Sequence, residues 1–141
     1  MSEAPTIWEN RVRFDETDLH GHVNFGEFFS YMDETFNELL RRIEYGYDRM
    51  HAEGWTTNIV HTEMDFRAPA EYGDEIENRM RVASMGERSL TATYEARATG
   101  TTLAEGEIVY VAVDYEGEEG AVPIPEEFRE AIVDFQDDPP G

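Results

Sequence analysis

The segment 15–27 concentrates the side chains that could do chemistry. Asn24 is followed three residues later by Glu27, which is the spacing of a helix N-cap and its capping-box partner. A helix that begins there has unpaired backbone N–H donors at Phe25, Gly26 and Glu27, at the positive end of its dipole. Gly26 has no side chain, so another group can approach this backbone closely. Such a helix end can hold an oxyanion.

Asp18 lies six residues before Asn24, near enough for a loop to bring its carboxylate to the same place. A carboxylate beside an oxyanion site suits acyl transfer, because it can attack a carbonyl or deprotonate a water. The structural alternative is that Asp18 is a solvated turn residue, and that Asn24 and Glu27 only cap a helix. Spacing alone fits both interpretations.

Hydrophobic periodicity predicts the elements around this segment. Apolar residues recur at helical spacing over 25–52, although Gly46 can break the last turns. A first strand is expected over 7–15, with Val12 and Phe14 as its alternate apolar positions. Near the end of the chain, Pro125 opens a short helix that runs through Phe135.

Four strands with a two-residue period follow the long helix. The alternate positions of the first three are Val60, Thr62, Met64 and Phe66, then Ile76, Asn78, Met80 and Val82, then Leu90, Ala92, Tyr94, Ala96 and Ala98. The last strand, 103–113, is apolar on both faces in its second half, so we expect it to be central or covered. The element order favours an α+β fold in which an antiparallel sheet wraps one long helix.

The composition is strongly acidic. The 141 residues include 32 acidic and 11 basic ones, which gives a net charge of −21. A field this negative repels nucleic acids and anionic lipids, so we expect no nucleic-acid partner. The basic residues are all Arg, and this acid-rich, Lys-free composition resembles halophilic acidic proteins from salt-accumulating cells. Cysteine is absent, which excludes disulfides and a Cys nucleophile.

The length predicts a single domain over 1–141, with a core at about 7–135 and flexible ends at 1–6 and 137–141. No apolar run approaches the ~18 residues that a membrane span needs. The first residues lack the basic and apolar regions of a signal peptide. We therefore expect no membrane association and, by default, a cytoplasmic location.

Several short motifs follow one another in a set order. Residues 18–24 read DLHGHVN, residues 64–70 read MDFRAPA, and residues 72–74 read YGD. In this order they resemble the hotdog-fold acyl-CoA thioesterases, in particular the 4-hydroxybenzoyl-CoA thioesterase-like family. The resemblance extends over about residues 11–132, and its specificity lies in the order of the motifs.

The resemblance implies a hotdog fold and thioester hydrolysis. Asp18 matches the catalytic carboxylate, acting as nucleophile or general base, and the Phe25 N–H matches the donor that polarises the thioester carbonyl. His22 and Asn24 match a Gly-His-Val-Asn variant that orients Asp18 or the water. Some relatives carry His where Phe25 stands, so any role of that side chain is lost here. The resemblance further implies an acyl-CoA substrate, no metal or other cofactor, and a homodimer or homotetramer with active sites at the interface.

Coenzyme A carries phosphates, which the overall charge repels unless positive charge is local. Arg67 at a strand end, and Arg88 with Ser89 after a glycine turn, are candidate binding residues because Arg can clamp phosphate bidentately. Gly26, at the start of the helix, joins them as a candidate substrate contact. The alternative for each Arg is a surface ion pair with a carboxylate.

Other chemistries have weaker support. His61, Glu63 and Asp65 alternate onto one strand face, but no metal site is expected because Cys and paired helical ligand motifs are absent. A Ser-His-Asp site lacks its Gly-x-Ser-x-Gly elbow. A hotdog hydratase or dehydratase needs an Asn-Pro pair after its Asp, and Asp18 has none. The alternative to an enzyme is a non-catalytic hotdog module that binds an acyl thioester or serves as a scaffold.

Overall fold

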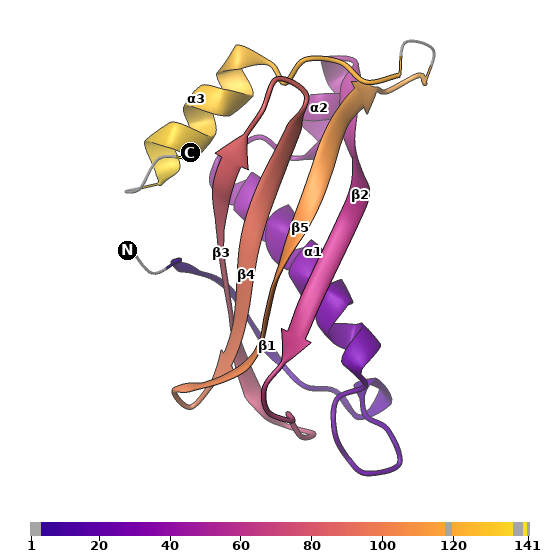
Figure 1. Cartoon of the computed structure of the whole chain (residues 1–141), viewed down its shortest axis with the longest axis vertical. Helices are drawn as coiled ribbons and strands as arrows, with labels where there is room; N and C mark the ends of the chain where they lie inside the picture. Colours follow the sequence, from indigo (N-terminus) through magenta and orange to yellow (C-terminus); the bar gives the residue numbers. More distant parts are fainter. Residues whose placement is uncertain (1–3, 118–119, 137–139, 141) are drawn as a thin grey trace.

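A computed structural model of the chain describes residues 4–117, 120–136 and 140. Five strands form one antiparallel sheet in the order β1-β3-β4-β5-β2, and helix α1 lies along one face of this sheet (Figure 1). The strands are β1 (Thr6–Arg11), β2 (Trp55–Phe66), β3 (Glu75–Met85), β4 (Ser89–Ala98) and β5 (Thr101–Asp114). The predicted α+β architecture, an antiparallel sheet around one long helix, is confirmed.

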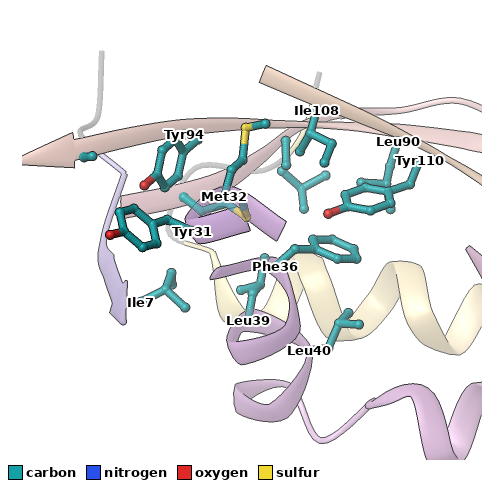
Figure 2. Packing of buried hydrophobic residues seen from close by; sticks show 14 of the residues in the cluster. Ile7, Tyr31, Met32, Phe36, Leu39, Leu40, Leu90, Tyr94, Ile108 and Tyr110 are labelled. Carbon is teal, nitrogen blue, oxygen red and sulfur yellow. The ribbon is translucent and has the colours of Figure 1, made fainter. Parts of the chain in front are cut away.

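The core lies between α1 (Phe25–Arg42) and the sheet. Helical positions three and four residues apart face inward, which is the pattern of an amphipathic helix. These buried residues are Phe28, Tyr31, Met32, Thr35, Phe36, Leu39 and Leu40. Figure 2 shows Met32 and Phe36 facing Ile108 and Tyr110 of the sheet, and the rings of Phe36 and Tyr110 stack at 4.0 Å between centroids.

The helix predicted over 25–52 is two helices. α1 ends at Arg42, and α2 (Tyr47–Ala52) follows a turn in which Glu44 adopts a left-handed conformation with φ 57°. This turn buries Tyr45 against Trp55 and Phe128, which a continuous helix would not allow. Gly46 is the N-cap of the second helix, so the predicted helix is interrupted directly before this glycine.

The periodicity of the middle strands and of the last helix gave correct predictions. Every alternate residue predicted for β3 and β4 is buried. The last strand, β5, lies between β4 and β2, so its predicted interior position is confirmed. Helix α3 (Glu126–Phe135) begins directly after Pro125, as predicted, and buries Phe128 and Ile132.

The predictions for the first strand were partly wrong. β1 ends at Arg11, opposite Glu75, the first residue of β3. The next residue, Val12, is buried as predicted and still bonds to the backbone of Gly73 and Asp74. Phe14 instead lies in a short 3₁₀ turn, η1 (Phe14–Glu16), with its side chain exposed. Thr6, predicted to belong to a flexible end, is part of β1. Residues 1–3, 137–139 and 141 of the predicted flexible ends lie outside the described part of the chain.

Strand β2 is longer and more exposed than predicted. It begins at Trp55, and Val60 and Phe66 of its predicted apolar face are exposed. In the described part of the chain β2 pairs only with β5, and its register shifts between Ile59 and His61. An edge position and a bulge explain why the burial pattern does not follow the simple alternation.

Among the described residues, no helix combines the length and the apolar character that crossing a membrane requires.

Candidate active site

A closed loop before α1 holds Asp18. The loop pairs Thr17 with Val23, and the Asp18 N–H donates to the His22 carbonyl at 2.8 Å. The Gly21 N–H donates back to the Asp18 carbonyl at 3.0 Å. Gly21 has φ 77°, a left-handed conformation that glycine adopts without steric cost. This local sequence therefore folds into a closed loop beside the start of α1 (Figure 1).

The carboxylate of Asp18 is oriented by backbone donors. Its Oδ1 accepts the N–H of His20 at 2.9 Å and the N–H of His22 at 3.3 Å. The His20 hydrogen bond, helped by the one from His22, holds the pKa of Asp18 below its ordinary value. Within the described residues both bonds go to Oδ1, which leaves Oδ2 available to a water or a substrate. The group is therefore an exposed, ionised and oriented carboxylate at neutral pH.

The start of α1 confirms the predicted N-cap but not the capping box. The Asn24 Oδ1 accepts the Gly26 N–H at 3.3 Å, and the Asn24 carbonyl accepts the Glu27 N–H at 2.9 Å. The Asn24 N–H, which a capping box would give to the Glu27 side chain, donates to the Glu16 carbonyl at 2.9 Å instead. The backbone of η1 thus satisfies the donor that the capping box was expected to satisfy.

One donor of the helix start remains unpaired. Of the three N–H groups predicted to be unpaired, those of Gly26 and Glu27 are used by Asn24. The Phe25 N–H has no acceptor among the described residues, and it lies at the positive end of the α1 dipole. This single amide is therefore the candidate oxyanion donor. A Cβ added at Gly26 would meet only the Asn24 side chain, at 3.9 Å, so the approach is open there.

Asp18 and Phe25 line the same pocket, which has a volume of about 390 Å³. The remaining lining residues come from the loop, the first turn of α1 and the segment after β2, and are His22, Val23, Phe28, Phe66, Arg67, Ala68 and Pro69. The ring of Phe66 forms edge contacts with Phe25 and Phe28, both at 5.9 Å between centroids. The pocket thus joins a carboxylate and a helix terminus to an aromatic wall.

The structure separates the predicted coenzyme A contacts. Arg67 lines the pocket, but its guanidinium also forms an ion pair with Glu105 at 2.8 Å and a longer one with Asp65 at 3.8 Å. Arg88 and Ser89 lie at the β3–β4 turn, at the opposite end of the sheet from the Asp18 loop (Figure 1). Within one chain, therefore, the described residues bring Arg67 to Asp18 but leave Arg88 and Ser89 distant.

Sequence reasoning did not identify the residues that fix the loop on α1. The Glu16 Oε1 accepts the Arg13 N–H at 2.8 Å and the Tyr31 hydroxyl at 2.9 Å. Burial, and next the hydrogen bond to Glu16, raise the pKa of Tyr31, so it stays a protonated donor. Tyr31 occupies a core position of the helix pattern, and nothing in that pattern distinguishes it from an apolar residue.

Phe66 was also missed as a lining residue. The sequence does contain a feature that could have identified Phe66. It is a large apolar residue at the end of a strand and lies inside the motif at 64–70. Its contacts with α1 depend on where β2 ends relative to the helix, which spacing does not reveal.

His61, Glu63 and Asp65 of β2 were expected on one strand face, but only the first two side chains contact each other. The His61 Nε2 lies 3.2 Å from Glu63 Oε1, whereas Asp65 faces Arg67. The third member of the group is Glu107 of β5, whose carboxylate lies within 4.8 Å of the ligand atoms of the other two.

Comparison with known proteins gives consistent matches. Residues 12–132 match the model of the thioesterase-like superfamily. The chain is 28% identical to the acyl-CoA thioester hydrolase YbgC of Escherichia coli O157:H7, over 76% of this chain and 81% of that protein. It is 27% identical to the 1,4-dihydroxy-2-naphthoyl-CoA hydrolase of Synechococcus sp. strain CC9605, over 81% of each. A thioesterase from Thermus thermophilus, solved in complex with coenzyme A and Zn, is similar with a TM-score of 0.82 and 29% identity, over 99% of both chains.

Proposed function

The chain belongs to the thioesterase-like superfamily, and from this premise we propose that it hydrolyses an acyl-CoA thioester to the free acid and coenzyme A. The prediction of a hotdog-fold thioesterase is confirmed at the level of fold, family and enzyme class. Relatives named as acyl-CoA and naphthoyl-CoA hydrolases support coenzyme A as the thiol carrier. The observation that carries the proposed chemistry is the pocket shared by Asp18 and the Phe25 N–H.

In this proposal the Phe25 N–H receives the carbonyl oxygen of the thioester. Negative charge develops on this oxygen as the carbonyl carbon becomes tetrahedral, and a preorganised donor stabilises that charge more than it stabilises the ground state. The dipole of α1 acts in the same direction. The support is that this N–H is unpaired while the next two along the helix are used.

Asp18 supplies the attack. As a general base it takes a proton from water while the water oxygen bonds to the carbonyl carbon. The carbon–sulfur bond then breaks, and the proton passes from Asp18 to the departing thiolate, which leaves as coenzyme A. As a nucleophile it bonds to the carbon itself and displaces the thiolate, and water then hydrolyses the resulting anhydride. Both routes need an ionised, oriented carboxylate, which the N–H donors of His20 and His22 support.

His22 and Asn24 act as positioning residues in this proposal. The support is that the His22 backbone bonds to Asp18 through both its N–H and its carbonyl, and that the Asn24 side chain caps α1. Both residues therefore hold the two halves of the site without needing to touch the substrate.

The acyl group and the coenzyme A occupy different parts of the pocket. The rings of Phe25, Phe28 and Phe66 offer an apolar wall for the acyl group. Arg67, half-exposed at the rim, offers a guanidinium to a phosphate if it exchanges its bond to Glu105. Gly26 keeps the approach to the amide open.

We also propose that the protein works as a homodimer or homotetramer. The support is the edge strand β2, which presents an unpaired backbone edge and exposed Ile59 and Val60 in the described structure. Two copies joined by a two-fold axis would each offer this same surface. A second copy is also the route by which Arg88 and Ser89 would reach the site of the first.

The remaining parts of the proposal concern organisation and environment. We propose one domain, a cytoplasmic location and a cell interior rich in salt. The support for the last is the charge of −21 and the absence of Lys. At about 1 M salt the Debye length falls to roughly 3 Å, which removes most of the charge repulsion.

The proposal is tested with a panel of aliphatic and aromatic acyl-CoAs in molar KCl, with a thiol-reactive dye to report free coenzyme A. Protein-dependent release from at least one member of the panel is the expected result. Binding of the acyl-CoAs without any release above the uncatalysed rate would instead identify a non-catalytic binding module and contradict the proposal.

A further inference from the structure

Two like-charged pairs lie next to each other on the sheet face that points away from α1. Glu63 of β2 is directly opposite Glu107 of β5, and Asp65 is directly opposite Glu105. Like charges in directly opposed positions destabilise a sheet. A positive charge beside either pair would therefore stabilise the sheet.

The pair of Asp65 and Glu105 has its cation within the chain. The Arg67 Nη2 lies 2.8 Å from Glu105 Oε1 and 3.8 Å from Asp65 Oδ2, so one guanidinium bridges both carboxylates. This arrangement shows how the fold compensates such a pair when an Arg is within reach.

The pair of Glu63 and Glu107 lies beside the imidazole of His61. The His61 Nε2 lies 3.2 Å from Glu63 Oε1, and one ligand atom from each of the three residues lies within 4.8 Å of the others. One nitrogen and two carboxylate oxygens are a ligand set that divalent transition metals accept.

The backbone holds these three groups together closely. Gly106, next to Glu107, lies so near β2 that a Cβ there would be 2.1 Å from the Glu63 carbonyl oxygen. A side chain at this position would force the two strands apart. The ligands thus stand on two rigid, tightly paired strands, which is the arrangement that favours metal binding.

We propose that His61, Glu63 and Glu107 bind one divalent transition-metal ion, Zn²⁺ or an ion of similar chemistry, which joins β2 to β5. The ion compensates this pair as Arg67 compensates the neighbouring one. All three side chains reach solvent, so water completes the coordination. The site is separate from Asp18 and takes no part in thioester hydrolysis. Spacing along the chain does not predict it, because only the register of β2 on β5 brings Glu107 to His61.

Calorimetric titration of the untagged, chelator-treated protein with ZnCl₂ at slightly alkaline pH tests the proposal. We expect saturation at one ion per chain and a Zn²⁺-dependent rise in Tm. His61→Ala and Glu107→Gln each weaken the affinity by about tenfold or more, a loss typical of altered metal sites. Glu105→Gln is the matched control, since it removes a carboxylate from the neighbouring pair and leaves the affinity near that of the wild type.

Two results would overturn the site. One is the absence of saturable Zn²⁺ binding; the other is an equal loss of affinity in Glu105→Gln and Glu107→Gln, which indicates diffuse attraction of cations to an acidic face. Co²⁺ bound to the wild-type protein gives a second readout that needs no variant. We expect a visible absorption band that Zn²⁺ removes, and the lack of any protein-dependent band contradicts the proposal.

Discussion

The carboxylate of Glu16 accepts the hydroxyl hydrogen of Tyr31 at 2.9 Å, which joins the segment before the Asp18 loop to the middle of α1. The carbonyl of Glu16 also accepts the Asn24 N–H, directly before the helix. Glu16 therefore holds the segment before the Asp18 loop to Tyr31 in α1 and to Asn24 directly before the helix. These two bonds fix the loop that carries Asp18 against the start of α1. This network makes the geometry of the pocket sensitive to a hydroxyl that lies outside it.

Removal of the Tyr31 hydroxyl tests this connection. In Tyr31→Phe the ring stays in the core while Glu16 loses one of its two donors, so we expect kcat to fall several-fold. The free energy of unfolding should fall by about 1 kcal/mol, the net value of a typical hydrogen bond. Steady-state kinetics and urea unfolding measure the two effects.

Tyr47→Phe is the matched control for this prediction. Its hydroxyl bonds to Thr57 at 2.8 Å, outside the Asp18 loop. We expect a similar loss of stability with unchanged kcat. Equal kinetic effects in both variants would show that Tyr31 acts through stability alone.

The Phe25 N–H can be removed without breaking the helix. Proline is tolerated at the first helical position, and Asn24 already has the extended ψ of 131° that a residue before proline prefers. Loss of an oxyanion donor typically lowers kcat by about 10²–10³-fold, so we expect a decrease of this size in Phe25→Pro. Phe25→Ala keeps the N–H and removes the ring, and should retain most of kcat. A Phe25→Pro variant as active as Phe25→Ala would exclude this amide as the donor.

The pH dependence of hydrolysis reports the protonation of Asp18. Since its pKa is lowered by the His20 N–H, the carboxylate stays ionised below the ordinary Asp range. We expect kcat/KM to stay level as the pH falls from neutral to the ordinary range of Asp, and to decrease only below that range. An acidic limb near neutral pH, well above the Asp range, would point to an essential base other than Asp18.

The lowered pKa of Asp18 also makes the free energy of unfolding depend on pH. A carboxyl whose pKa is lower in the folded state stabilises the protein above its unfolded-state pKa, and this contribution disappears as the pH falls through the folded-state value. Tryptophan fluorescence should therefore be measured at each acidic pH to show that the protein is still folded. Only then can a fall in kcat/KM be assigned to Asp18.

The charge of −21 predicts a stability that increases with salt. Raising KCl from about 0.1 M to about 1 M shortens the Debye length from about 10 Å to about 3 Å and so weakens repulsion among the carboxylates. We expect Tm to rise across this range in thermal unfolding. A Tm that stays constant or falls would show that ion pairs such as Arg11–Glu75 contribute more to stability than the repulsion costs.

The parts of the fold that the sequence predicts are those governed by local periodicity. Alternation in β3 and β4 and the N-cap at Asn24 report directly on burial and on the helix start. The end of β1 and the exposure of Phe14 depend on where β3 begins, which is far away in the chain. Local patterns carry no information of that kind.

The candidate site also has features that the local sequence predicts and contacts that it does not predict. The loop around Asp18 and the unpaired Phe25 N–H follow from residues close in sequence, and both are present. The contacts of Phe66 and the bond between Tyr31 and Glu16 join separate elements, so spacing alone could not reveal them. Arg67 was selected for its charge, but its pairing with Glu105 depends on the register of β2 and β5.

The most direct measurement for the central claim is the turnover of Asp18→Asn on an acyl-CoA substrate in molar KCl. The amide has nearly the shape of the carboxylate but can neither take a proton from water nor attack a carbonyl. We predict that kcat falls by about 10²–10⁴-fold, the range that general-base catalysis supplies, while KM and the circular dichroism spectrum stay close to those of the wild type. A variant that keeps near-wild-type kcat would contradict the assignment of Asp18 and the mechanism built on it.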